Sequence, residues 1–341
     1  MKSPRAWRRS AVNLPDPFEA HLEQLIHERS ESALLSEMLR YHLGLFERDR
    51  LRRGKRLRPK LLFAIVQELG GRNDDALDAG VAIEVLHNYS LVHDDIEDGD
   101  RYRHGRQTLW AKYGTPQAIN AGDALCALSY LSLLKTAQYH SPARVTAMMH
   151  ALHRANFAMC EGQSLDIAFE SEGTIDTKRY LRMIAGKTAA LFGAAAELGA
   201  YCSGAGEADV EHYGSLGRSF GIAFQINDDI LGIWGDEQDT GKTAGADIAR
   251  RKKSFPIVWA MQSGLPGAKT IADMYSGDDE RIDADAIQLV MDALEAAGAR
   301  EASEHEAAER LSAARESSPG VVRDFLLNAL PLTTQTQPLS S

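Results

Sequence analysis

Cysteine is scarce in this chain of 341 residues, and its three cysteines are scattered without paired spacing. This pattern excludes a disulfide framework and a zinc ribbon, and it predicts a reducing, cytoplasmic location. No apolar run approaches the roughly 20 residues that a membrane span needs. Four basic residues lie in the first nine positions with no apolar segment behind them, so a secretory signal is not expected.

Aromatic residues are also few, at 7%, and Ala, Leu and Glu outnumber Val, Thr and Tyr, which favours helix over strand. Hydrophobic residues make up 44% and charged residues 25%, a mixture typical of soluble globular proteins. The chain carries 48 acidic and 38 basic residues, for a net charge of −10. That balance argues against a general nucleic-acid binder and is compatible with a metal-dependent site.

Helical periodicity extends along nearly the whole chain, and no convincing alternating strand is present. We therefore predict one large all-α domain over residues 18–330, preceded by a flexible extension at 1–17 and followed by a disordered tail at 331–341. A helix is expected to begin with a cap at Asn73-Asp74 and to end at Gly99. The other expected helices cover residues 18–47, 117–139, 142–169, 177–200, 208–231 and 257–262.

Two clusters of aspartates end two of these apolar helices. The segment from Asp94 to Asp100 holds five carboxylates in seven residues, and Asp94 and Asp98 share one helical face. Like charges at that spacing, at the negative end of a helix dipole, oppose folding unless a cation compensates. Asp228 and Asp229 form the second cluster. One interpretation is a solvated acidic surface; the other is two facing ridges that bind magnesium and, through it, a polyanionic phosphate.

Basic residues gather in a separate region of this acidic protein. Eight basic residues and one acidic residue lie between Arg48 and Lys60, directly before an apolar run. A solvated basic face and a nucleic-acid arm are the alternatives to a phosphate site. His87 lies seven residues before Asp94, on the same helical face. Further candidate phosphate ligands follow at Arg101, Arg103, Arg106, Lys187, Lys242 and Lys252.

Seven short motifs follow one another along the chain. They are GKRLRP from Gly54, LVHDDIED from Leu91, RHGRQT from Arg103, INAGDAL from Ile119, GQSLDI from Gly162, KTAALF from Lys187 and QINDDILGIWGDEQDTGKTAGAD from Gln225. Each is weak alone, but the ordered set is specific. Together they resemble the trans-type isoprenyl diphosphate synthases (polyprenyl synthetases), over about residues 18–259. The family resemblance implies an all-α helical bundle of the isoprenoid synthase type with a central cavity.

The resemblance also implies roles for particular residues. The first aspartate motif binds magnesium that holds an allylic diphosphate, and the second completes a cluster of about three Mg²⁺, which Mn²⁺ can replace. The implied metal ligands are Asp94, Asp98 and Asp228, within a catalytic set of Asp94, Asp95, Asp98, Lys187, Asp228 and Asp229. Isopentenyl diphosphate is implied to bind Lys55, Arg58 and His87, and the allylic diphosphate to contact Arg103, Thr188, Gln225, Lys242 and Lys252 in addition to Lys187.

The implied reaction joins isopentenyl diphosphate to dimethylallyl, geranyl or farnesyl diphosphate. The allylic C–O bond ionises, the alkene attacks the carbocation, and a proton is lost, with the released diphosphate as the expected base. An apolar cavity is needed because water would quench the cation. The family is commonly homodimeric, so a homodimer is expected.

Three positions depart from the family pattern. His104 replaces a second arginine that usually contacts isopentenyl diphosphate, with Arg106 as an alternative ligand, and Gln107 replaces a proline. Gly232 stands where the second motif usually carries its final aspartate. Asp236, seven residues after Asp229, is a hypothetical replacement, and a surface role for it is the alternative.

Product length is expected to depend on the cavity floor, since each helical turn adds roughly 5.4 Å of depth. An aromatic residue at Tyr89 and a small one at Ser90, five and four residues before Asp94, resemble the pattern of geranylgeranyl diphosphate synthases. We therefore predict a twenty-carbon product, with fifteen carbons as the next choice. In the alternative, Tyr89 only packs between helices.

Two other functions compete with this prediction. A class I terpene cyclase shares the fold and metal chemistry, but it has no use for the isopentenyl-binding residues of GKRLRP and His87. A regulatory subunit of a heteromeric synthase tends to lose aspartates of the first motif, and this chain keeps them all.

Overall fold

The computed structural model describes residues 13–15, 17–29, 31–46, 54–235, 244–275 and 283–330. In this part of the chain almost all regular structure is helical, as predicted. The helices are α1 (Phe18–Arg29), α2 (Ala33–Leu43), α3 (Leu57–Glu68), α4 (Asn73–Glu97), α5 (Leu109–Tyr113), α6 (Thr115–Lys135), the 3₁₀-helix η3 (Thr136–Gln138), α7 (Pro142–Ser171), α8 (Thr177–Ile184), the π-helix η4 (Ala185–Ala189), α9 (Ala190–Cys202), α10 (Glu207–Trp234), α12 (Ala246–Ala249), α13 (Phe255–Gln262), α14 (Ala268–Tyr275), α15 (Ala284–Ala296), α16 (Ala299–Glu316) and α17 (Gly320–Ala329). No described helix is long and apolar enough to span a membrane.

One small strand pair interrupts the helical chain. Strands β1 (Tyr102–Arg103) and β2 (Arg106–Gln107) pair antiparallel directly after α4. His104 and Gly105 form the connecting turn, both with positive φ, at 51° and 72°. The sequence analysis missed this hairpin because two-residue strands are too short to show an alternating pattern.

The long helix α4 differs from its prediction at one end and agrees with it at the other. Arg72, and not Asn73, is its N-cap residue, no side chain caps it, and Asn73 is already helical. At the other end Asp98 is the C-cap, and Gly99 turns the chain away with φ of 66°. A left-handed residue just after a helix is where glycine is favoured, so the predicted stop is confirmed.

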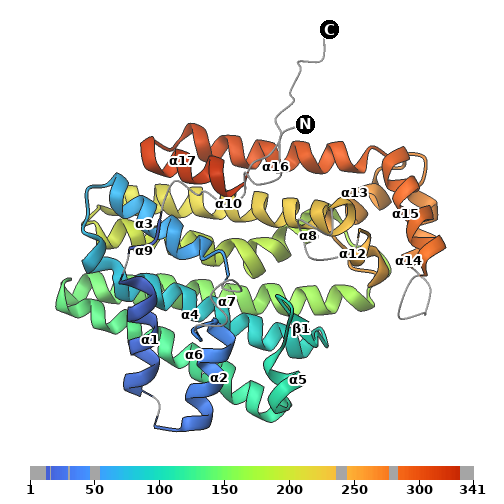
Figure 1. The fold of residues 1–341 in the computed structure, drawn as a ribbon. Helices are drawn as coiled ribbons and strands as arrows, with labels where there is room; N and C mark the ends of the chain where they lie inside the picture. The colour runs from blue at the N-terminus through green and yellow to red at the C-terminus, as the bar shows by residue number, and fades with distance from the viewer. Residues whose placement is uncertain are drawn as a thin grey trace.

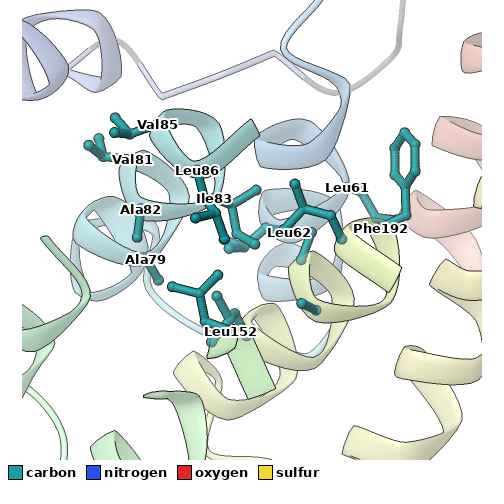
Figure 2. Close-up of a cluster of buried hydrophobic side chains, with 14 of the residues drawn as sticks. Leu61, Leu62, Ala79, Val81, Ala82, Ile83, Val85, Leu86, Leu152 and Phe192 are labelled. Atoms are coloured by element: carbon teal, nitrogen blue, oxygen red, sulfur yellow. The ribbon is translucent and has the colours of Figure 1, made fainter. Parts of the chain in front are cut away.

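The core surrounds α4, which is buried on all sides along its first half. Figure 2 shows its side chains beside those of α3, α7 and α9; those labelled are Leu61, Leu62, Ala79, Val81, Ala82, Ile83, Val85, Leu86, Leu152 and Phe192. A helix that is apolar all round is stable only when other helices enclose it. In Figure 1, α16 lies along α10 and α17 lies against α3, while α1 packs on α4 and α6 and α2 packs on α6. The acidic end of α4 therefore projects from a fixed core.

Glycines let α7 approach the π-helix closely. A Cβ on Gly162 would lie 2.1 Å from the backbone nitrogen of Lys187, and one on Gly186 would lie 2.5 Å from the carbonyl oxygen of Ala158. No larger residue fits either position without moving the backbone. The extra residue per turn of a π-helix is a frequent device at functional sites. Here it carries Lys187 and Thr188, two of the predicted site residues.

Candidate active site

A cavity of about 400 Å³ lies between the acidic end of α4, the start of α3, the β-hairpin, η4 and α10. It brings together most of the residues that the sequence analysis selected from segments far apart in the chain. Those that line it are Lys55, Arg58, His87, Ser90, Asp94, Asp95, Arg103, Lys187, Thr188, Gln225, Asp228 and Lys252. Asp98, Asp229 and Tyr89 are not among the lining residues. Lys242 and Asp236 lie outside the described residues.

The first aspartate pair divides its two carboxylates between different tasks. Asp94 lines the cavity, and no described side chain forms a hydrogen bond or ion pair with its carboxylate. Burial raises the pKa of Asp94 to about 7, although the charge of Lys187 opposes this rise. Asp95 is only 2% exposed, and its Oδ1 accepts a hydrogen bond of 2.8 Å from Nε of Arg103. Asp95 therefore holds the hairpin arginine at the cavity wall.

The second pair follows the same division more strictly. Asp228 lines the cavity. Asp229 has no exposed surface; its Oδ2 accepts from the Tyr180 hydroxyl and from the backbone N–H of Phe255 at 3.0 Å. Its Oδ1 accepts from Nε2 of Gln225 at 3.2 Å and Nζ of Lys252 at 3.4 Å. Both carboxylate oxygens of Asp229 are therefore engaged inside the protein, and a catalytic role for this residue stays a prediction.

The acidic residues face three cationic or polar side chains, which are those of Lys187, Thr188 and Gln225. Nζ of Lys187 donates to Oδ2 of Asp166. Burial favours the neutral form of Lys187, but the charges of Asp166 and Asp94 outweigh it and raise the pKa of this lysine. On the same turn, the Thr188 hydroxyl donates to Oε1 of Gln225 at 2.7 Å. These bonds fix η4 against α7 and α10.

Asp166 was not assigned a role from the sequence, although it belongs to the quoted motif GQSLDI. Its contact with Lys187 spans 21 residues, so no local pattern marks it. The sequence feature that could have pointed to Asp166 was its place in this motif.

Asp247 is a second residue that the sequence analysis missed. A Cβ on Gly232 would lie 2.2 Å from Oδ2 of Asp247, so this carboxylate occupies the space that a side chain at position 232 would need. Asp247 is 7% exposed and lies 3.7 Å from Nζ of Lys252. The glycine that departs from the family pattern thus makes room for a carboxylate from α12.

The opposite wall is basic. Arg58 stacks over the Phe192 ring at 4.4 Å, and burial lowers its pKa to about 10, against the opposing charge of Glu84. Burial, with the charges of Arg58 and Arg103, also lowers the pKa of His87, so this imidazole is neutral. A neutral imidazole binds phosphate through one N–H donor.

Arg106, the alternative to the missing arginine, lines the cavity but is held at its edge. Its Nη1 donates to the carbonyl oxygen of Tyr41 at 2.8 Å, and its guanidinium lies 4.8 Å from the Tyr41 ring centre. His104 lies in the hairpin turn, and burial lowers its pKa. Arg106 is thus engaged with Tyr41, and its use in place of the missing arginine stays a prediction.

The predicted floor residues are placed differently from each other. Ser90 lines the cavity with Met159 and Phe224, and its hydroxyl donates to the carbonyl oxygen of His87 at 2.8 Å. The Tyr89 ring instead packs edge-on against His93 at 5.2 Å, and its hydroxyl lies 3.4 Å from Sγ of Cys160. The packing alternative for Tyr89 therefore matches its contacts, and a role in product length stays a prediction.

The donor chemistry of the acidic residues fits magnesium. Asp94, Asp98 and Asp228 offer hard carboxylate oxygens, and the lining residues Asp94 and Asp228 lack a described hydrogen-bonding partner. No group of three His, Cys, Asp or Glu side chains in the described part of the chain converges closely enough to hold an ion by itself. Magnesium suits such a site because it keeps water and substrate phosphates among its ligands.

Comparison with known proteins agrees with this architecture. The family description of polyprenyl synthetases matches residues 35–294. A geranylgeranyl diphosphate synthase from Mycobacterium tuberculosis is 36% identical, over 90% of this chain and 88% of that protein. A (2E,6E)-farnesyl diphosphate synthase from Mycobacterium bovis is 39% identical, over 68% of this chain and 65% of that protein. The crystal structure of a geranylgeranyl pyrophosphate synthetase from Pyrococcus horikoshii superposes with a TM-score of 0.81 at 31% identity, covering 92% of this chain and 93% of that one.

The fold and the cavity thus define an enzyme of the helical prenyltransferase class. The match extends over more than half of the chain, and the chain belongs to the polyprenyl synthetase family.

Proposed function

We propose that the protein is a geranylgeranyl diphosphate synthase. It condenses isopentenyl diphosphate with dimethylallyl, geranyl or farnesyl diphosphate and releases diphosphate. The observation that carries this proposal is the single cavity with Asp94, Asp228 and two lysines on one side and Lys55, Arg58 and His87 on the other. A terpene cyclase would need only the first of these two walls.

In this proposal the acidic wall receives the allylic diphosphate together with magnesium, which Mn²⁺ can replace. Asp94, Asp98 and Asp228 would hold about three Mg²⁺, whose charge stabilises the departing diphosphate. Lys187, Lys252 and Arg103 neutralise the remaining charge as the allylic C–O bond breaks. Each of these cations is already fixed by a buried or half-buried carboxylate: Asp166, Asp229 and Asp95.

The basic wall holds isopentenyl diphosphate so that its alkene faces the allylic carbon. Lys55 and Arg58 supply charge, and neutral His87 supplies an N–H donor. Positioning both substrates in one cavity converts a bimolecular encounter into an effectively unimolecular step. The apolar residues Met159 and Phe224 keep water from the carbocation. No lining residue is a clear general base, so the released diphosphate is assigned the final proton.

A twenty-carbon product is favoured over a fifteen-carbon one. The small Ser90 under Asp94 leaves depth for a long chain, and the Mycobacterium tuberculosis relative is named for the longer product. The Mycobacterium bovis relative, named for the fifteen-carbon product, supports farnesyl diphosphate synthase as the second candidate.

The outer faces of α6 and α7 support a homodimer as the working assembly. Leu131 and Leu134 on α6 are 38% and 48% exposed, and Phe157 on the neighbouring α7 is 67% exposed. Large apolar side chains gathered on adjacent helices are typical of protein interfaces.

The three cysteines are all unpaired, and a cytoplasmic location stays the prediction made from them.

Product analysis tests the function directly. The purified protein is incubated with Mg²⁺, isopentenyl diphosphate and each allylic starter, and products are separated by chain length. We expect geranylgeranyl diphosphate from all three starters and no product from an allylic diphosphate alone. Hydrocarbon or alcohol from one allylic diphosphate would identify a cyclase instead, and inactivity of the chain by itself would favour a regulatory subunit.

A further inference from the structure

A buried ion pair forms part of the basic lining of the cavity, and the reaction described above does not use it. The side chains of Arg56 and Glu84 are each 4% exposed, and Nη1 of Arg56 lies 2.7 Å from Oε1 of Glu84. Nη2 of Arg56 donates to the carbonyl oxygen of Leu43 at 2.9 Å, and its Nε lies 3.3 Å from Oε1 of Glu19. The guanidinium is therefore held from α4, from the end of α2 and from α1.

The backbone of Arg56 shows what this network resists. Arg56 has φ of 52° and ψ of 39°, the left-handed region, at the N-cap of α3. This conformation is strained for a residue with a Cβ, which keeps it only when its surroundings impose it. Lys55 precedes this turn and Arg58 follows it by two residues, and both line the cavity. The contacts of the Arg56 side chain thus fix the turn that directs both phosphate-binding residues.

Glu84 connects this turn to α4. Its Oε1 also accepts from Nδ2 of Asn88 at 2.7 Å, and the same amide donates to the Glu84 carbonyl oxygen at 2.8 Å. The carboxylate cannot rotate freely, because Arg56 and Asn88 hold it from two sides. His87 lies three residues further along α4, on the same wall. Two of the expected isopentenyl ligands, Lys55 and Arg58, therefore flank a turn that is held by one buried carboxylate.

We infer that Glu84 is a positioning residue for isopentenyl diphosphate, acting through Arg56 on Lys55 and Arg58. The inference rests on the proposed function and names a determinant of one of its two substrate sites. It assigns no role in ionisation of the allylic diphosphate, which binds the opposite wall.

Two effects oppose each other when Glu84 is neutralised. Removing a negative charge from a basic wall favours diphosphate binding, while removing the partner of a buried guanidinium destabilises its fixed position. The second effect dominates, because an uncompensated buried charge is strongly unfavourable and the left-handed turn depends on it. Several other cations already face the substrate, so one further increment of positive potential adds little.

The test compares Glu84→Gln with the wild type, using steady-state kinetics and calorimetric titration with isopentenyl diphosphate. We expect KM and Kd for isopentenyl diphosphate to rise about tenfold, with KM for farnesyl diphosphate changed by less than about twofold. Glu19→Gln, which touches Arg56 only at 3.3 Å and from a more exposed side, should give about a threefold rise.

A matched control comes from the other end of α3. Glu68 is also partly buried, and its Oε2 accepts from the backbone N–H of Val321 at 2.6 Å, but it does not line the cavity. Glu68→Gln should lower Tm and leave both KM values unchanged. If Glu84→Gln does not fold, Arg56→Lys keeps the charge, loses the multiple hydrogen bonds of the guanidinium, and should show the same split between the two KM values.

An unchanged or lower KM for isopentenyl diphosphate in Glu84→Gln and Arg56→Lys would overturn the inference, as would equal rises for both substrates. These outcomes differ from failure of the proposed function, in which the wild type forms no product from the two substrates.

Discussion

The two aspartate pairs resemble each other in sequence but differ in how completely the protein encloses their second members. In each pair the first residue, Asp94 or Asp228, lines the cavity. The second residue is buried and fixes a cation: Asp95 holds Arg103, and Asp229 holds Lys252. Asp95 has one such partner, whereas Asp229 accepts four hydrogen bonds from α8, α10, α13 and the segment before α13. Asp95 thus holds the β-hairpin through Arg103, whereas Asp229 holds together several helices around the site.

The largest effect is expected from Asp229→Ala. This change removes the acceptor for the Tyr180 hydroxyl, the Phe255 N–H and the charged Lys252 at once. Breaking a buried pair of this kind costs about 3–5 kcal/mol of unfolding free energy, and activity should be lost with it. Chemical denaturation with an activity assay measures both. A variant as stable as the wild type would show that the enclosure of Asp229 contributes little.

Asp228→Ala should separate activity from stability. Its carboxylate has no described partner, so unfolding free energy should change by less than about 0.5 kcal/mol. Loss of this proposed metal ligand should lower kcat about a thousandfold, because metal contacts supply several kcal/mol of transition-state stabilisation. The matched control is Asp209→Asn, an exposed acid in the first turn of α10, which should change neither. A large loss of stability in Asp228→Ala would show that Asp228, like Asp229, stabilises the fold.

Asp95→Asn sharpens the comparison from the other side. The protein should still fold, because Arg103 is 30% exposed, but the Arg103 side chain should lose its fixed position. KM for the allylic diphosphate should therefore rise about tenfold. Asp100 forms a similar 2.8 Å pair with Arg250 but does not line the cavity, so Asp100→Asn is the control. Equal KM values in the two variants would contradict a role for Asp95 in holding Arg103 toward substrate.

The smallest effect is expected from Gly232→Ala. The new Cβ would displace the Asp247 carboxylate from the surroundings of Lys252, lowering stability by about 1 kcal/mol and kcat about threefold. Gly214, on the same helix, also lies close to a carboxylate: a Cβ there would be 2.6 Å from Oε1 of Glu197. Gly214→Ala should therefore cost similar stability while activity is retained. Unfolding and kinetic measurements on both variants distinguish a role for Asp247 from simple crowding.

Local signals in the sequence predicted most of the helices. The apolar periodicity of α4, α7 and α10 placed these helices within a few residues of their ends, and Gly99 marked the stop of α4. The N-cap of α4 was wrong, because Asn73 begins the helix instead of capping it. The β-hairpin and the π-helix were missed, since neither two-residue strands nor one widened turn changes the pattern enough to be seen.

The site was predictable where its residues lie in ordered motifs and not where contacts join distant segments. Lys55 and Lys187 were selected from motifs and His87 from its helical spacing to Asp94, and the three do line one cavity. The sequence analysis gave no role to Glu84, Asp166 or Asp247. Glu84 and Asp166 each fix a cation, and Asp247 occupies the space that a side chain at position 232 would need. Their partners lie between 15 and 28 residues away in the chain, too far for any helical periodicity to relate them.

The sequence by itself determined that the chain is helical and that two Asp-Asp pairs end apolar helices, because both properties depend on neighbouring residues. Only the tertiary structure decided which member of each pair is buried. Adjacent residues on a helix point about 100° apart, so Asp94 and Asp95, or Asp228 and Asp229, cannot share a direction. The packing of α4 against Arg103 and of α10 against Tyr180 and Phe255 turns one carboxylate inward and leaves its neighbour at the cavity.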